Sequence, residues 1–438
     1  MQINIYQIDA LAGKVVAIAT PDYSTFFAAL TQKSENYEIE CSDQGQKMYH
    51  LPDRQLVSEA SLLASSCYSV EWAKNEAAAS LVSDEGDVYV WRTDGTAPFV
   101  VGSAMPSSGA AWSPNSSQLV VTSLTTEGGS GTFNIAYLDG KPMQITGATI
   151  EAGNGWDPTN VLWLTNTIVQ NMRQCGDGGA CLSYSYYDAN TGKYLIGYIV
   201  DAHLGEGQFA LLSPNEQWLA LDTYLNEDVW EQRYSYENRV MVLYDLKNHK
   251  KHVWANGDDS YAFSGWASDS REFYFVRYPF EGQKPGTLLG LIALDPFTLK
   301  TKVVIPNVLL ASESPDHNSI FVIPAATIRT WQAIQLQAAV YTPAGKRITP
   351  LQDVANHLDF ENLGSVLIPS EWSHKSNQVV FADSSGNLWL FNSEGKSTRL
   401  ASSLPTEEWP EETAFKWSPD DRRLFVYRAH RAWVVTIN

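Results

Sequence analysis

The stretch from Ser365 to Ala401 reads SVLIPSEW, SHKSN, QVVFAD, SSGN, LWLFN, SEGK, STRLA, and it decides the fold. Four short apolar runs, rich in β-branched and aromatic residues, alternate with turns of Ser, Gly, Asn and Lys. This pattern predicts one four-stranded antiparallel sheet with tight turns. Runs of adjacent apolar residues such as VVF and LWLF, in place of strict alternation, indicate that both faces of the sheet are covered.

The same plan recurs along the whole chain. A turn of the Ser-Pro-Asp type stands between two apolar runs nine times, and in six copies the residue before the turn is Trp. Successive copies begin 40 to 59 residues apart, at Ala19, Trp72, Trp112, Trp156, Leu212, Trp266, Glu313, Trp372 and Trp417. A recurring period of this size is typical of an array of identical supersecondary units.

Sheets that bury two faces must stack on their neighbours, and radial stacking of four-stranded sheets gives a β-propeller. We therefore predict an all-β protein with a single propeller domain over residues 1–438. The Trp before each turn is expected at the end of the innermost strand, wedged between blades. Burying such a ring removes roughly 150–250 Å² from water, with an upper bound of about 4–6 kcal/mol per Trp.

The two ends of the chain are expected to complete one blade. The last unit, 413–438, has three strands of its own, and the run INIYQID over Ile3–Asp9 offers a fourth. Pairing the two ends would close the ring and remove free sheet edges. We count nine blades; eight remains an alternative, because the motif at Trp72 is weak, and a split into two smaller propellers is another.

Three segments carry a resemblance to a known family: WSPDDRRLFVYR, WSPNSSQLVVTS with IAYLDGKPMQIT, and LSPNEQWLALD with VMVLYDLKNHK. They resemble the WD40-like repeats of the TolB type, whose units read roughly W-S-P-D-G, a strand, then I-Y-V-x-D-x-D-G. The resemblance covers essentially the whole chain and implies a propeller. It implies little about function, because propellers of this type serve as binding platforms, peptidase lids and enzymes.

Charge and hydropathy limit the partners. The chain of 438 residues has a net charge of −19, and its Lys and Arg residues are scattered, which argues against binding nucleic acid. No apolar run approaches 18 residues, so no membrane insertion is expected. The start MQINIYQID lacks the features of a signal peptide. We nevertheless expect a monomeric bacterial protein that is extracellular or periplasmic, with its leader absent from this chain.

The four cysteines support that expectation. Cys175 and Cys181 bracket the segment GDGGA and are predicted to close a small disulfide loop, and Cys41 and Cys67 are candidates for a second disulfide. Disulfides persist in oxidising compartments. Four free thiols are the alternative, and the spacing is a poor zinc signature.

Long connections suggest where a ligand would bind. The links between second and third strands are predicted to be long in five consecutive units, and three links between units, 53–65, 351–364 and 402–412, are long as well. All of them emerge on one face, which we expect to bind a partner. The segment Leu225–Asn238 is the leading contact candidate, with Trp230, Glu231, Tyr234 and Tyr236; the alternative is that these aromatics pack on their own blade.

No cluster in the sequence specifies a reaction. A G-x-S-x-G elbow, an H-E-x-x-H pair and a P-loop are absent. We therefore predict a non-catalytic binding or scaffold propeller that recognises a protein, a peptide or a carbohydrate and needs no cofactor. One alternative is a propeller enzyme of the glycan lyase or lactonase type, with an axial metal site to which His203 and His357 could contribute. A structural assembly component is the third reading.

Overall fold

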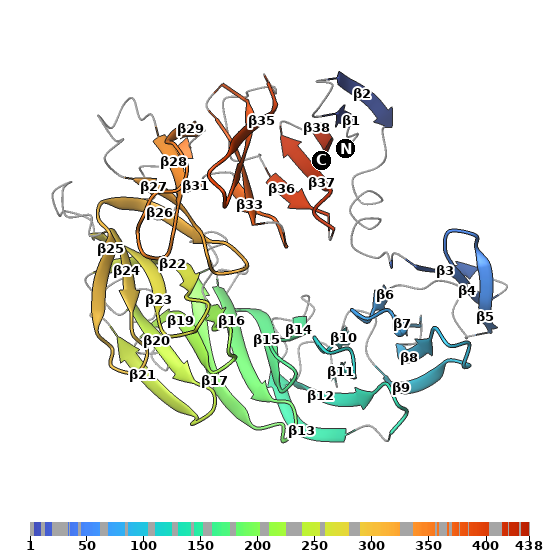
Figure 1. Ribbon diagram of the computed structural model, residues 1–438. Helices are drawn as coiled ribbons and strands as arrows, with labels where there is room; N and C mark the ends of the chain where they lie inside the picture. The colour runs from blue at the N-terminus through green and yellow to red at the C-terminus, as the bar shows by residue number, and fades with distance from the viewer. Residues whose placement is uncertain are drawn as a thin grey trace. The chain divides into compact units, whose positions relative to one another are not determined.

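The computed structural model contains strands, turns and bends and no helix among the residues it describes (Figure 1). These are residues 4–9, 14–19, 34, 36–42, 45–61, 69–83, 86–103, 110–124, 130–141, 144–151, 160–175, 181–201, 210–224, 239–254, 259–279, 290–324, 336–354, 357–358, 366–367, 370–375, 377–383, 385–402, 414–418, 420–428 and 431–437. The chain forms two compact units: Ser24–His203 is the smaller unit, and Met1–Tyr23 with Leu204–Asn438 is the larger one.

The smaller unit holds four sheets in chain order. The three-stranded sheet consists of β3 (Tyr37–Ser42), β4 (Gly45–His50) and β5 (Gln55–Ala60). The four-stranded sheets are β6 (Ser69–Trp72), β7 (Ala78–Val82), β8 (Asp87–Arg92) and β9 (Phe99–Ser103); β10 (Ala110–Trp112), β11 (Gln118–Leu124), β12 (Ser130–Tyr137) and β13 (Gln144–Glu151); and β14 (Asn160–Trp163), β15 (Ile168–Cys175), β16 (Cys181–Asp188) and β17 (Tyr194–Asp201).

The larger unit holds four more four-stranded sheets. They are β18 (Ala210–Leu212), β19 (Trp218–Tyr224), β20 (Arg239–Asp245) and β21 (Lys250–Trp254); β22 (Asp259–Trp266), β23 (Phe273–Pro279), β24 (Gly290–Leu294) and β25 (Thr301–Ile305); β26 (Val308–Glu313), β27 (Ile320–Pro324), β28 (Leu336–Tyr341) and β29 (Gln352–Val354); and β32 (Ser370–Trp372), β33 (Gln378–Ala382), β34 (Leu388–Asn392) and β35 (Ser397–Ala401). A short hairpin of β30 (His357–Leu358) and β31 (Val366–Leu367) precedes the last of them.

The four-stranded sheets share one topology, with strands paired antiparallel in the order in which they follow along the chain. Such sheets are the blades of β-propellers. In this arrangement the turns between first and second and between third and fourth strands leave one edge of the sheet, which we call the turn edge. The second-to-third connections and the links to the next sheet leave the other edge, the loop edge.

Both chain ends contribute to one five-stranded sheet, which differs from the predicted blade. β36 (Ala414–Trp417), β37 (Arg423–Arg428) and β38 (Arg431–Thr436) are antiparallel, but β1 (Asn4–Asp9) pairs with β38 in parallel, and β2 (Lys14–Ala19) adds a fifth strand. The predicted antiparallel fourth strand is therefore wrong in direction. The apolar pattern of a strand selects the face that it buries, and it leaves the direction of pairing open.

The first and fourth units also differ from the sequence prediction. β2, expected as the innermost strand of the first unit, lies in the five-stranded sheet, and 55–60 form β5 instead of a link between units. In the fourth unit, the Trp that ends the first strand is Trp163, seven residues after the predicted Trp156, which lies outside the described residues. The reason is that WDPTN matches the turn consensus better than WLTNT, whereas pairing with β15 selects Trp163.

Other predicted loops contain strands. Residues 168–175 of the predicted long loop 166–180 form β15, which pairs with β16 along its full length. The predicted link 351–364 contains β29 and β30, and the predicted approach strand of the eighth unit divides into β31 and β32. Polar residues in IVQNMRQC suggested a loop, but backbone pairing needs no apolar side chain at every position.

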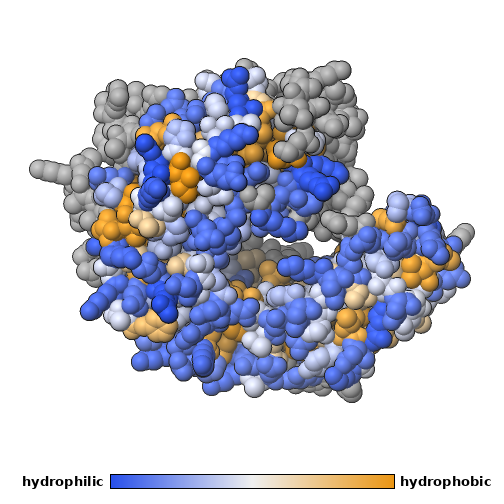
Figure 2. Space-filling view, viewed as in Figure 1, coloured by the Kyte–Doolittle hydropathy of each residue, from blue (hydrophilic) through white to orange (hydrophobic). Residues whose placement is uncertain are grey.

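The hydrophobic core lies between consecutive sheets. One cluster joins Phe273 and Phe275 of sheet β22–β25 to Trp218 of the sheet before it, and another joins Trp417 and Trp433 to the apolar residues of β33 and β34. Sheet β22–β25 buries both faces, as adjacent apolar runs predicted, because Tyr274 and Val276 of β23 pack into a second cluster on its other face. Sheet β3–β5 differs, since exposed and partly buried residues alternate along β3. In the view of Figure 2 the surface is mostly hydrophilic, with separate small hydrophobic patches.

A hydrogen bond from the repeated Trp accompanies this packing. The indole Nε1 of Trp417 donates to the carbonyl of Glu371, the residue before the corresponding Trp372 of the preceding sheet. The same bond joins each of the following donors to the carbonyl of the equivalent residue one sheet earlier: Trp112 to Glu71, Trp163 to Ala111, Trp266 to Leu211 and Trp372 to Ser312. We call this bond the indole link.

Trp163→Phe and Trp417→Phe are each expected to lower the free energy of unfolding by about 1–3 kcal/mol, because the ring is kept while a partly buried carbonyl loses its donor. Urea denaturation of each variant measures the loss. Unchanged midpoints in both variants would show that the indole links contribute nothing to stability.

Candidate functional site

The turn between the first and second strands is closed by the same hydrogen bonds in several sheets. In the turn after Leu212, Ser213 N donates to Trp218 O at 2.8 Å, and Ser213 Oγ accepts the amide N–H of Trp218 at 2.9 Å. Ser113, Ser314, Ser373 and Ser418 repeat both bonds. The third residue after the turn Ser has a positive φ in four of these turns, as in Glu216 at 56° and His317 at 61°. These five Ser-containing turns therefore share one pattern of closing hydrogen bonds.

Turns of neighbouring sheets are joined by a second type of bond. Asn75 N donates to Ser116 Oγ, Asn115 N to Asn166 Oδ1 and Asn215 N to Ser270 Oγ, each from one turn to the next. Asn377 Nδ2 donates to Asp316 Oδ2, and the carboxylate of Asp421 accepts the amides of His374 and Lys375 at 2.8 and 2.6 Å. We call these bonds the turn links.

The junction between sheets β22–β25 and β26–β29 lacks both links among the described residues. Glu313 stands where the other sheets carry Trp, so no indole is present, and its Oε2 accepts the backbone N–H of Trp266 at 2.6 Å. In an indole link, the Trp side chain donates, and the peptide C=O of a residue near the end of the first strand of the preceding sheet accepts. At the Glu313 junction the side chain accepts, and the Gly265–Trp266 peptide of the preceding sheet donates its N–H. Donor and acceptor are therefore exchanged.

Gly265 makes this exchange possible. Its φ is 150°, a conformation that residues with a side chain rarely adopt, and a register shift lies between Phe263 and Gly265 in the pairing of β22 with β23. A Cβ at this position would lie 2.6 Å from Glu313 Cβ and 2.7 Å from its Cδ. Glycine is thus required both by the backbone and by the carboxylate that packs on it.

Glu313 and His317 form a buried pair. The Glu313 side chain is 4% exposed and the His317 side chain 29%, and Nδ1 of the imidazole lies 2.9 Å from Oε2. Burial raises the pKa of Glu313, although the bonds from His317 and Trp266 oppose the shift. The hydrogen bond to Glu313 raises the pKa of His317. Since Nδ1 faces the carboxylate, Nε2 is left for another partner.

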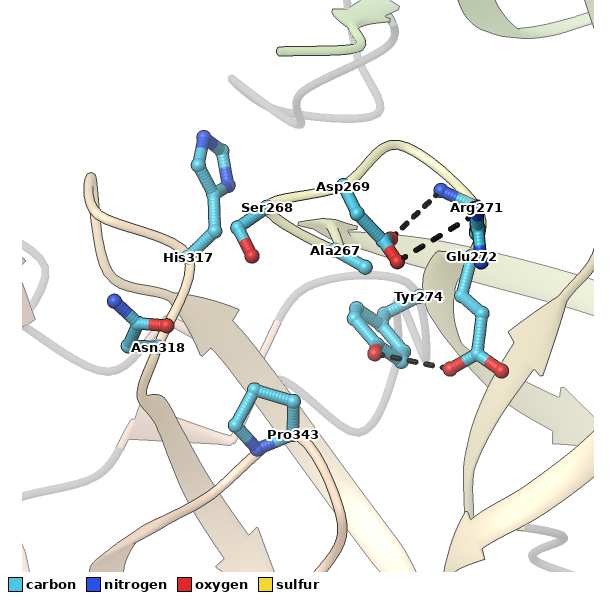
Figure 3. Close-up of a pocket in the computed structure, with 9 residues that line it drawn as sticks. All are labelled: Ala267, Ser268, Asp269, Arg271, Glu272, Tyr274, His317, Asn318 and Pro343. Atoms are coloured by element: carbon cyan, nitrogen blue, oxygen red, sulfur yellow. Dashed lines mark hydrogen bonds and ion pairs between the residues drawn. The ribbon is translucent and has the colours of Figure 1, made fainter.

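A pocket of about 350 Å³ opens where the turn link is missing (Figure 3). The turn after β22 contributes Ala267, Ser268, Asp269, Arg271 and Glu272, and β23 contributes Tyr274; the turn after β26 contributes His317 and Asn318, and Pro343 follows β28. All of these residues belong to the larger unit and lie at the turn edge.

The acidic groups of the pocket already have partners. Asp269 Oδ1 accepts the amide of Arg271 at 3.0 Å, and Glu272 accepts the Tyr274 hydroxyl at 3.1 Å and pairs with Lys302. Burial, and then the neighbouring Glu272, raise the pKa of Tyr274, so its hydroxyl stays protonated. The acidic side chains of the pocket are therefore engaged within the protein.

Trp230, Glu231, Tyr234 and Tyr236 lie in 225–238, outside the described residues, as does His203. His357 lies in β30, with its side chain undescribed. The described part of the chain contains no group of three or more His, Cys, Asp or Glu residues that could hold a metal, and no helix there is long and apolar enough to cross a bilayer.

The three cysteines within the described residues lie on strands. Cys41 in β3 is disulfide-bonded, and Cys67 lies outside the described residues. Cys175 and Cys181 end β15 and begin β16, and the register places them directly opposite each other. Opposite residues of an antiparallel pair have Cα atoms about 4.5–5.5 Å apart, a range that disulfides span.

Sequence reasoning did not identify Gly265, Glu313 or His317 as a group. The available signal was the replacement of Trp by Glu at the seventh repeat, followed four residues later by His in ESPDHN. The matching Gly265 belongs to the preceding repeat, 48 residues earlier in the chain. Only the packing of two sheets shows that the three residues meet.

Comparisons with known proteins give no family. No protein-family model and no curated protein matches the sequence. Among solved structures, a crystal structure of a eukaryotic initiation factor is similar at a TM-score of 0.42 and 10% identity, over 90% of each chain. The tricorn protease is similar at a TM-score of 0.37 and 10% identity, over 91% of this chain and 37% of that one.

Gly265→Ala is expected to lower the free energy of unfolding by about 1–3 kcal/mol through backbone strain. The overlap with Glu313 adds to this loss. In a Glu313→Ala background the same substitution should therefore be less damaging, which a double-mutant cycle measured by urea denaturation tests. Equal losses in both backgrounds would show that the glycine does not accommodate the carboxylate.

Stability is expected to depend on pH through His317. Its pKa in the folded protein is raised above the ordinary value of 6.5, so its contribution is fully present below pH 6.5 and is lost as the pH rises through the folded pKa. The raised pKa of Glu313 acts in the same direction at lower pH. The stability advantage of the unmodified protein over His317→Gln should thus shrink between pH 6 and pH 9, as thermal unfolding at both pH values will show; a constant advantage would contradict the assignment.

Proposed function

We propose that this protein is a non-catalytic β-propeller binding module, in which the successive sheets close into one ring and a partner binds at the loop edge. The chain is then a single domain over residues 1–438 with nine blades, and its repeats resemble the WD40-like repeats of the TolB type. Nine sheets of three or more strands among the described residues support the count. The pairing of β1 with β38 supports closure, because it joins the first strand to the last.

The unequal length of the connections is the observation that carries the proposal. In sheets β18–β21, β22–β25 and β26–β29, the first-to-second turns span 213–217, 267–272 and 314–319. The third-to-fourth turns, on the same edge, span 246–249, 295–300 and 342–351, so one turn-edge connection is long as well. The second-to-third connections of these sheets span 225–238, 280–289 and 325–335. Long connections cost ordering entropy and add nothing to blade packing, so three of them on the loop edges of consecutive sheets are best explained by binding.

The composition of the longest connection indicates its ligands. Residues 225–238 contain Trp230, Tyr234 and Tyr236 among acidic residues such as Glu231. Aromatic rings supply contact area at a low entropic cost, and carboxylates accept hydrogen bonds from sugar hydroxyls or from basic side chains. A carbohydrate, a peptide or a basic protein suits this surface. The net charge of −19 disfavours a nucleic acid.

Export to an oxidising compartment is part of the proposal. The disulfide at Cys41 and the opposite placement of Cys175 and Cys181 support it. Structural disulfides of this kind persist outside the cytosol. We place the protein in the periplasm or outside a bacterial cell, as a monomer.

Trp230→Ala should reduce binding at least tenfold without changing the melting temperature, because a central interface Trp often contributes 2 kcal/mol or more. Binding is measured on a glycan array and against immobilised basic peptides. Phe297→Ala is the matched control: Phe297 is 60% exposed, but it lies at a turn edge, between β24 and β25. Unchanged binding in Trp230→Ala, or an equal loss in Phe297→Ala, would remove the loop edge as the binding surface.

A further inference from the structure

The turn link made by Asp421 shows how a carboxylate binds to this type of turn. Its two carboxylate oxygens accept the amide N–H groups of His374 and Lys375, the second and third residues after Trp372. A carboxylate that accepts two backbone N–H groups is held strongly, because both hydrogen bonds are assisted by its charge. In this junction the carboxylate comes from the next turn of the same chain.

The corresponding amides in the pocket belong to Ser268 and Asp269, the second and third residues after Trp266. The two turns are closed by equivalent bonds, Ala267 N to Glu272 O and Ser373 N to Gln378 O, both at 2.8 Å. Within the described residues, the amides of Ser268 and Asp269 have no hydrogen-bond partner. The position of Asp421 is taken by His317, which is bound to Glu313.

We propose that the pocket binds the carboxylate of a ligand through the backbone N–H groups of Ser268 and Asp269 and through Nε2–H of His317. This site lies at the turn edge and is separate from the loop-edge surface. The ligand replaces the carboxylate that Asp421 supplies at the equivalent junction. Its chemistry is a carboxylate presented at a chain end, as in the C-terminus of a peptide or in a uronic acid.

Charge in the pocket permits an anion. Glu313 is neutralised by His317, and Glu272 by Lys302. Asp269 is held by its own turn, next to the 81% exposed Arg271.

The other groups that bear on His317 are also accounted for. Burial opposes ionisation of Asp316 in the same turn, but hydrogen bonds from Ser314 and Asn318 lower its pKa, so it stays a bound anion. Tyr274 is neutral. The imidazolium of His317 is therefore the titrating donor that faces the ligand, and affinity should fall as the pH rises through its pKa.

A proline substitution removes the Ser268 N–H and is compatible with the shape of these turns. Pro114, Pro214 and Pro315 stand at the same position in other turns, so Ser268→Pro follows the repeat and removes only the N–H and a small side chain. His317→Gln removes the cationic donor. His374→Gln is the matched control, because it changes a His in a turn whose amides are already bound to Asp421.

The experiment follows the amide resonances of Ser268 and Asp269 and the ring of His317 by NMR. The probes are a tripeptide with a free C-terminus, the same tripeptide as its C-terminal amide, glucuronate and methyl glucoside. We expect the carboxylate probes to shift these signals, and the two neutral probes to leave them unchanged. Binding should weaken at least tenfold in Ser268→Pro and in His317→Gln, and stay within twofold in His374→Gln, with each variant measured well below its own melting temperature.

The four probes distinguish a peptide carboxylate from a sugar carboxylate. Shifts with the free tripeptide alone identify a peptide C-terminus, and shifts with glucuronate alone identify a uronic acid; either result supports the site. Equal shifts with a carboxylate probe and its neutral counterpart, no shift with any probe, or unweakened binding in a folded Ser268→Pro would overturn it. None of these outcomes depends on the loop-edge surface.

Discussion

The indole link between consecutive sheets is the interaction on which the rest of the structure depends. A four-stranded sheet with apolar side chains on both faces is unstable alone, and it is stabilised when neighbours cover it. The Trp at the end of the first strand fills the contact and directs its only polar atom to a carbonyl one sheet earlier. Each described link therefore sets the position of one sheet on another. It thereby also sets the distance between the turns that follow the first strands of the two sheets.

The junction at Glu313 shows how a regular framework acquires a site. Exchanging donor and acceptor needs three changes together: a carboxylate for the indole, a glycine that lets the peptide present its N–H, and a histidine that neutralises the carboxylate. Because His317 is bound to Glu313, it makes no turn link, and a pocket opens. The carboxylate alone would be a buried charge without donors, which is costly, and the Trp266 N–H and His317 supply donors to its Oε2.

Much of the fold could be predicted from the residues, because its signals are local. Alternation of apolar runs with Ser, Gly and Asn turns in Ser365–Ala401 marks strands and turns within a few residues of their observed ends. The errors have physical causes as well. Trp156 matched the turn consensus, but backbone pairing selected Trp163, and β15 forms across polar residues because its hydrogen bonds come from the main chain.

By itself, the sequence determined the sheet as the repeating element, the Trp as the residue between sheets, and a net charge of −19. Those properties follow from residue types and short spacings. Tertiary structure alone decided the parallel pairing of β1 with β38, and the meeting of Gly265 with Glu313 and His317. Contacts between residues about fifty positions apart depend on how one sheet stacks on the next, and no local pattern encodes that geometry.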